Sequence, residues 1–210
     1  MAQGDKPHHE ISMSAGIMTN QAYDTRLTYQ YYLNKSIGVG ASFGYYKQWH
    51  ANHIPQSELH HEEWDSWRLS EKDCKPQNIY LEPSLSINSP AIAQVGRWSF
   101  KLGVDFGVMF QLPYTLVNVK YINTTTQASQ QKSIHTNDMQ WCFWDIRPTV
   151  RVESNNIFVA LGYGFSDFDV YSSYRKISVQ GKAFDDFYPK KKLGISDKKR
   201  PKISCNPFIY

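Results

Sequence analysis

The sequence predicts an all-β protein, an eight-stranded antiparallel up-and-down transmembrane β-barrel in which the eighth strand is the least regular. Three observations support this fold class. Apolar and polar residues alternate with a period of two in segment after segment. The clearest of these segments is about twice as long as an ordinary strand. The connections between segments alternate between short and long, which is typical of barrels in the bacterial outer membrane.

The clearest alternating segment covers residues 98–110. One face carries Trp98, Phe100, Leu102, Val104, Phe106, Val108 and Phe110, and the other carries Ser99, Lys101, Gly103, Asp105, Gly107 and Met109. At about 3.4 Å per residue, such a strand extends about 44 Å. Tilted by about 45°, it would rise about 31 Å, which is close to the thickness of a bilayer's hydrocarbon core.

Six further segments show the same alternation, each bounded by Asn, Gly, Pro or Ser. They cover residues 10–18, 25–33, 36–49, 78–89 and 140–153, and a segment that opens at Ile157 and runs to Phe165. Both ends of an outer-membrane barrel normally lie in the periplasm, so an eighth strand is expected at residues 202–210. Its alternation is poor, and Pro201 and Pro207 bracket it.

The connections predict which end of the barrel faces outward. Short turns lie at 34–35, 90–96 and 154–156, and long loops lie near 50–77, 113–139 and 171–201. In outer-membrane barrels the short side is periplasmic and the long side is extracellular. We therefore expect residues 1–9 to be a periplasmic tail and residues 10–210 to be a single barrel domain.

If the apolar faces point into lipid, the polar faces must fill the barrel. An eight-stranded interior is just wide enough for side chains and leaves no open pore. The predicted interior charges are four bases and four acids, which can pair: Arg26, Lys101, Arg147 and Arg151 with Glu82, Asp105, Asp145 and Glu153.

The alternative is a soluble lipocalin-like ligand-binding barrel or a β-sandwich, in which the apolar face points inward. Alternation by itself does not distinguish these arrangements. The strand length and the aromatic residues near strand ends, such as Trp49, Trp98, Trp141 and Trp144, favour the membrane.

The segments SIGVGASFGYY, RWSFKLGVDFGVMF and IFVALGYGF resemble the strands of small eight-stranded outer-membrane barrels, typified by OmpX and the OmpA transmembrane domain. The resemblance covers roughly residues 10–170. It implies a monomer that is exported through a signal peptide, removed from this sequence, with roles from envelope integrity to adhesion and host contact. It brings no cofactor or catalytic residue. The final Tyr210, preceded by Phe208, is similar to the signal that the outer-membrane assembly machinery recognises.

Composition excludes several other classes. Of the 210 residues, 41% are hydrophobic and 15% aromatic, too many for a disordered chain. No run approaches the roughly 18 apolar residues of a membrane-spanning helix. The net charge of +4 is local, because residues 171–210 carry ten Lys and Arg against three Asp. These lysines lack interleaved aromatics, which disfavours nucleic acid, and they could instead pair with lipopolysaccharide phosphates.

Two candidate sites of chemistry lie in the predicted loops. His50, His53, His60 and His61 lie within one loop and could ligate Zn, Cu or Ni, but we expect them to belong to a solvated polar surface loop. Ser133, His135 and Asp138 could form a lipid-A-modifying site, and we expect chance to account for them. The sequence therefore predicts a structural or adhesive protein rather than an enzyme.

Overall fold

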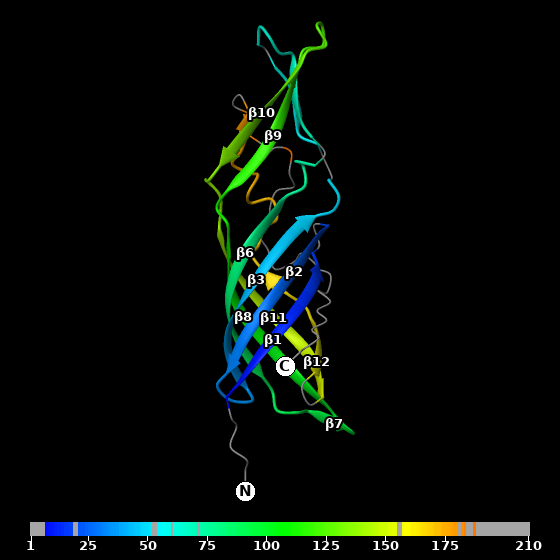
Figure 1. Cartoon of the computed structure of the whole chain (residues 1–210), viewed down its shortest axis with the longest axis vertical. Helices are drawn as coiled ribbons and strands as arrows, with labels where there is room; N and C mark the ends of the chain where they lie inside the picture. Colours follow the sequence, from blue (N-terminus) through cyan, green and yellow to red (C-terminus); the bar gives the residue numbers. More distant parts are fainter. Residues whose placement is uncertain are drawn as a thin grey trace.

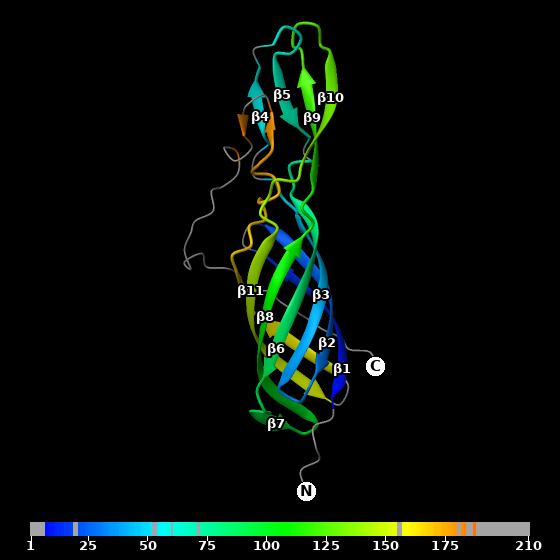
Figure 2. The ribbon, with the colours of Figure 1, turned by 90° about the vertical axis from the view of Figure 1, so that its left-hand side faces the viewer.

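The computed structural model describes residues 7–18, 21–51, 54–59, 61–70, 72–154, 157–179, 182–183 and 187. Within these residues the chain is all-β, and every strand pairing is antiparallel. No helix in this part of the chain is long and apolar enough to cross a membrane. The described molecule is elongated, with the short turns of a main sheet at one end and a second sheet at the other (Figures 1 and 2).

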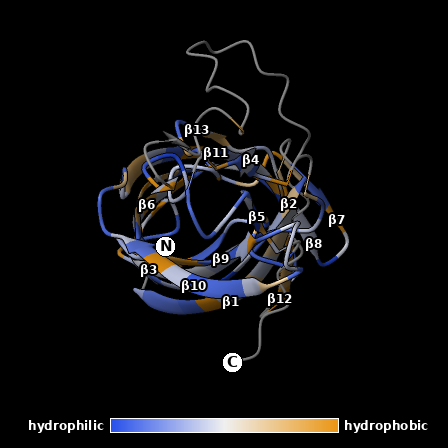
Figure 3. Cartoon of the chain, turned by 90° about the horizontal axis from the view of Figure 1, so that it is seen from above, coloured by the Kyte–Doolittle hydropathy of each residue, from blue (hydrophilic) through white to orange (hydrophobic). Residues whose placement is uncertain are grey.

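The main sheet contains the seven segments that the alternation predicted. Its strands follow the order β1 (His8–Ile17), β2 (Ala22–Tyr32), β3 (Ile37–Gln48), β6 (Gln77–Asn88), β8 (Trp98–Gln111), β11 (Cys142–Ser154) and β12 (Ile157–Gly162). Two short strands are added at its margins, β7 (Ala93–Val95) on β8 and β13 (Phe165–Ser166) on β11. The sheet curls around a central axis into an open, barrel-like shape, which is called the barrel below (Figure 3).

The curled sheet has two edges, β1 and β12. Within the described residues, no backbone pairing joins these two strands. Side chains nevertheless cross the interior, since Arg151 of β11 lies 2.6 Å from Glu10 of β1. The predicted eighth strand, residues 202–210, lies outside the described residues.

Burial alternates along each strand of the main sheet, and polar side chains take the inner face. Strand β6 shows this most clearly, because Tyr80, Glu82 and Ser86 are buried while Leu81 and Leu85 are exposed. In β8, Phe106 is 41% exposed and the intervening Gly107 is buried. The arrangement is the inverse of a soluble lipocalin-like barrel, whose apolar face points inward.

Two ranges predicted as long loops instead form a second sheet beyond the barrel. Its strands follow the order β10 (Ser129–Thr136), β9 (Thr115–Ile122), β5 (Ser66–Leu69) and β4 (Gln56–Glu58). It folds because one face is apolar: Trp67, Leu69, Val117 and Val119 are almost fully buried. The predictions of loops at 50–77 and 113–139 were therefore wrong for these strands. The N-terminal tail is also shorter than predicted, since β1 begins at His8.

A third element lies in the last predicted loop. Residues 167–177, here called the mouth segment, contain turns and run between the barrel and the second sheet (Figure 2). They lead into a short hairpin of β14 (Ser178–Val179) and β15 (Lys182–Ala183).

Interior glycines make room for large side chains on neighbouring strands. A Cβ atom added to Gly44 would lie 2.1 Å from the ring of Tyr80, the residue paired with it on β6. We therefore expect Gly44→Ala to lower the free energy of unfolding by about 1–3 kcal/mol, as overpacking of a filled interior does. Urea unfolding of the purified protein measures this. Ser84→Ala, which adds no atom to the same inner face, is the control, and equal effects of the two substitutions would contradict the explanation.

Candidate functional site

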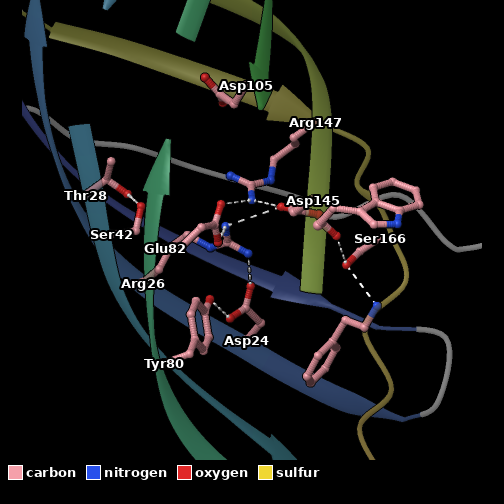
Figure 4. A network of polar contacts seen from close by, with 12 residues as sticks. Asp24, Arg26, Thr28, Ser42, Tyr80, Glu82, Asp105, Asp145, Arg147 and Ser166 are labelled. Atoms are coloured by element: carbon pink, nitrogen blue, oxygen red, sulfur yellow. Dashed lines mark hydrogen bonds and ion pairs between the residues drawn. The ribbon is translucent and has the colours of Figure 1, made fainter. Parts of the chain in front are cut away.

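The most prominent site is a buried ion-pair network at mid-height in the barrel (Figure 4). Arg26 lies 2.5 Å from Asp24, 2.8 Å from Glu82 and 3.8 Å from Asp145. Arg147 contacts Asp145 and lies 3.2 Å from Glu82. The two guanidinium groups thus share Glu82 of β6 and Asp145 of β11, and Arg26 also pairs with Asp24 of its own strand, β2.

Sequence and register explain why these side chains meet. Arg26 and Glu82 lie on the inner faces of β2 and β6, separated by β3. Inner positions of β3 are small, with Ser42 paired to Glu82 and Gly44 paired to Arg26. On the other flank, a Cβ atom at Gly107 would lie 2.6 Å from Glu82. Small residues beside long charged ones let the ion pairs cross the lumen.

A second cluster lies nearer the N-terminal end of the barrel. Arg151 contacts Glu10 through both terminal nitrogens, at 2.6 and 3.1 Å, and its Nε lies 3.1 Å from Glu153. Lys101 also pairs with Glu153. The Arg151 guanidinium lies 3.4 Å above the centre of the Phe158 ring, a cation–π contact.

The eight charges predicted for the interior all have inward positions, and the structure adds two more. Seven of the eight take part in the ion pairs above, and Asp105 accepts a hydrogen bond from Ser86. Glu10 and Asp24 were not predicted, although both are buried. The alternation could have identified them, because Glu10 and Asp24 each lie two residues before the first polar residue assigned to the inner face of their strand. With them, the described interior holds six acids against four bases.

The space between the two clusters is too small for an open channel. A polar cavity of about 50 Å³ lies there, lined in part by Ser12, Thr28, Gln30, Ser84 and Thr149. A single water needs roughly 10–15 Å³ of such volume, so the cavity accommodates a few waters. Side chains therefore fill most of the space between the two clusters.

Above the ion pairs the interior becomes apolar. The hydrophobic core joins barrel residues, the mouth segment and the second sheet, and includes Tyr46, Trp67, Tyr80, Met109, Val117, Val119, Phe143, Val170, Tyr171, Tyr174 and Ile177. Phe168 of the mouth segment packs edge-on against Tyr46 and Phe143, with ring centres 4.8 and 5.1 Å apart. The mouth segment and the apolar core beneath it therefore cover the end of the barrel that faces the second sheet.

Hydrogen bonds fix the mouth segment to the barrel rim. Gln48 donates to the Tyr171 hydroxyl at 2.7 Å, and Gln111 donates to Ser172 at 2.8 Å. Within the segment, Arg175 lies 2.7 Å from Asp169. The sequence analysis placed 171–201 in a loop and missed this packing, although the aromatic spacing of Phe168, Tyr171 and Tyr174 was a signal for it.

The predicted metal ligands do not form a described site. His50 and His61 are both exposed, and His61 Nδ1 accepts a hydrogen bond from the Glu63 amide at 3.2 Å. His53 and His60 lie outside the described residues. Where the structure describes the chain, no group of three or more His, Cys, Asp or Glu is placed to hold a metal ion.

The candidate nucleophile and base do not meet either. Ser133 and His135 lie on β10, and the Ser133 hydroxyl donates to Asn118 at 2.7 Å. The His135 ring stacks on Tyr114. Asp138 pairs with Lys176 at 3.8 Å. Each residue thus has a separate partner, and the geometry gives no support to a catalytic triad.

Comparisons with known proteins supply no assignment. No protein-family model matches the chain, and neither does any curated protein or solved structure searched. The functional argument therefore depends on the physical features described above.

Replacing Arg26 should strongly destabilise the fold. Arg26→Gln leaves Asp24, Glu82 and Asp145 buried around a neutral group, and we expect a loss of about 3–5 kcal/mol in the free energy of unfolding. The control is Lys176→Gln, which removes an ion pair between side chains 60% and 81% exposed and should cost less than about 1 kcal/mol. Urea unfolding compares the two, and similar losses would show that the buried network contributes no more than a surface pair.

Asp65 provides a pH-dependent contact in the second sheet. Its carboxylate accepts hydrogen bonds of 2.6 Å from both the hydroxyl and the amide of Thr124, which lower its pKa below the ordinary 3.8. The stabilisation is present at neutral pH and is lost as the pH falls from about 4 through the lowered pKa. We expect Thr124→Ala to raise the Asp65 pKa toward 3.8 in an NMR titration. An unchanged pKa would show that the hydroxyl contributes nothing.

Proposed function

We propose that the chain is a bacterial outer-membrane β-barrel protein, with a sealed polar interior and a structural or binding role exercised through the second sheet. The observation that carries the proposal is an outward apolar row that crosses adjacent strands. Met13, Leu27, Phe43 and Leu81 are paired in register on β1, β2, β3 and β6, and each is 53–59% exposed. A continuous apolar surface of this kind favours lipid over water.

The apolar surface extends around the described barrel strands. Its other members include Ile11, Ile17, Leu33, Ile37, Val39, Ile79, Leu85, Ile87, Leu102, Phe106, Val108, Val150, Ile157, Val159 and Leu161. Trp98 lies exposed near one end of this band, and Trp49, Trp141 and Trp144 lie exposed toward the other. Aromatic girdles at both margins of an apolar band are typical of membrane barrels.

Membrane insertion also requires the barrel to close. An unpaired strand edge in hydrocarbon would leave backbone N–H and C=O groups unsatisfied at several kcal/mol each. We propose that an eighth strand closes the sheet between β12 and β1, as the parity argument expects. The result is a monomeric, closed eight-stranded barrel.

This topology would place the second sheet outside the cell. The sheet is attached to the barrel end opposite the short turns, and β10 exposes most of its side chains. We propose that this sheet contacts an extracellular ligand or host surface, while the barrel contacts outer-membrane lipid and lipopolysaccharide. Biogenesis would use the outer-membrane assembly machinery. The separated Ser133, His135 and Asp138 leave the lipid-A-modifying alternative without a supporting observation.

A pair of matched substitutions tests the membrane assignment. Leu27 and Leu116 are exposed to similar extents, 55% and 47%, but Leu27 lies in the apolar band and Leu116 on the second sheet. In a bilayer, Leu27→Arg should cost about 2–4 kcal/mol, whereas Leu116→Arg should be nearly neutral. Reversible folding into phosphatidylcholine vesicles, followed by heat-modifiable gel migration, measures both. If both substitutions are neutral, or if the protein is monodisperse without detergent, the proposal fails.

A further inference from the structure

A basic groove lies on the outer surface at the margin of the apolar band. It has a volume of about 480 Å³ and is lined by Tyr23, Lys47, Gln48, Trp49, Lys72 and Lys75. Its three lysines come from different places, the end of β3 and the segment before β6. Among the described residues that line the groove there is no carboxylate, so this lining carries a net positive charge.

The order of side chains along β3 places this groove at a membrane interface. The outward row passes from Val39 and Phe43, both exposed, through Tyr45 to Lys47. The Tyr45 hydroxyl donates to Gln77 of β6 at 2.8 Å. Along this row, apolar side chains give way to a tyrosine hydroxyl and a glutamine amide, and then to a lysine. This is the order expected for a surface that passes from the hydrocarbon core of a membrane to its headgroups.

The backbone holds the groove in shape. Lys47 is paired in register with Tyr23 on one side and Gln77 on the other. The backbone N–H of Gln48 donates to the carbonyl oxygen of Pro76 at 2.9 Å, and this hydrogen bond joins the two segments that carry the lysines. Asp73, between Lys72 and the buried Cys74, is engaged elsewhere, since it accepts hydrogen bonds from Ser70 and Asn118.

We propose that this groove binds the phosphate groups of an outer-leaflet glycolipid of the lipid A type. The inference rests on the proposed outer-membrane function and adds a specific lipid site to it. Ammonium groups pair with phosphates through charge-assisted hydrogen bonds. The acyl chains of such a lipid would continue along the exposed Phe43 and Leu27 beneath the lysines, which a soluble anion would not do. None of the lining residues belongs to the basic region at 171–210 noted in the sequence.

The test uses the full chain in detergent, titrated by native mass spectrometry with diphosphorylated lipid A. Each lysine near an anionic lipid surface contributes about fivefold, so we expect the triple variant Lys47→Gln, Lys72→Gln and Lys75→Gln to bind about 100-fold more weakly. The control variant Lys120→Gln, Lys132→Gln and Lys176→Gln removes the same charge outside the groove and should bind within about twofold of the unmodified protein. Equal losses in the two variants, or no loss in either, would overturn the proposal.

Two further ligands identify the chemistry that is recognised. Dephosphorylated lipid A should bind the unmodified protein about as weakly as lipid A binds the groove variant. Inorganic phosphate alone should not displace the lipid. Equal binding of the dephosphorylated lipid, or displacement by inorganic phosphate at matched concentration, would contradict a site for the phosphate groups of a lipid-A-type glycolipid.

Insertion into neutral phosphatidylcholine vesicles separates this inference from the proposed function. These vesicles carry no net charge, so insertion does not depend on the groove. Insertion without discrimination between phosphorylated and dephosphorylated lipid A would refute the lysine groove alone. Failure of the unmodified protein to insert would refute the membrane assignment and the groove with it.

Discussion

The fold depends on burying paired charges where most proteins bury apolar side chains. Isolated carboxylates or guanidinium groups in this interior would cost several kcal/mol each, so each must have partners and hydrogen bonds. Arg26 meets this requirement with three carboxylates, and Arg151 meets it with Glu10, Glu153 and an aromatic ring. Once the inner face is satisfied in this way, the strand geometry forces the alternate residues outward. The exposed apolar surface is therefore a direct consequence of the polar core.

The ion pairs also restrict how the sheet curls. Glu10 and Arg151 belong to strands at opposite sides of the described sheet, and their contact brings β1 toward β11 across the lumen. Glycine at positions such as 44 and 107 keeps the inner wall thin where the longest side chains cross. Shape and electrostatics are thus linked, since a larger residue at these positions would displace the partner that neutralises a buried charge.

The sequence was sufficient to predict the main sheet because a period of two is unambiguous over long segments. It identified the polar row of β8 and β11, including Asp105 and Arg147, without any knowledge of strand order. Glu10 and Asp24 were missed because they lie at or just outside the predicted strand starts, and strand boundaries are the least certain feature of a pattern. The second sheet was missed because β4 and β5 cover only three and four residues. The burial of β5 and β9 also depends on packing against each other and the mouth segment, which the pattern of neither strand shows alone.

The interior changes character along its axis, and this change explains how one chain combines a barrel with an outer sheet. Inward positions are charged at Glu82 of β6 and Asp145 of β11, but the next inward positions toward the mouth on the same strands are the aromatic Tyr80 and Phe143. That apolar end gives the mouth segment and the second sheet a surface on which to form a common core. Because β9 continues from β8 after only three residues, the sheet is held to the barrel by both chain connection and packing. A surface fixed in this way loses little conformational entropy when it binds a partner, which suits a rigid scaffold for recognition.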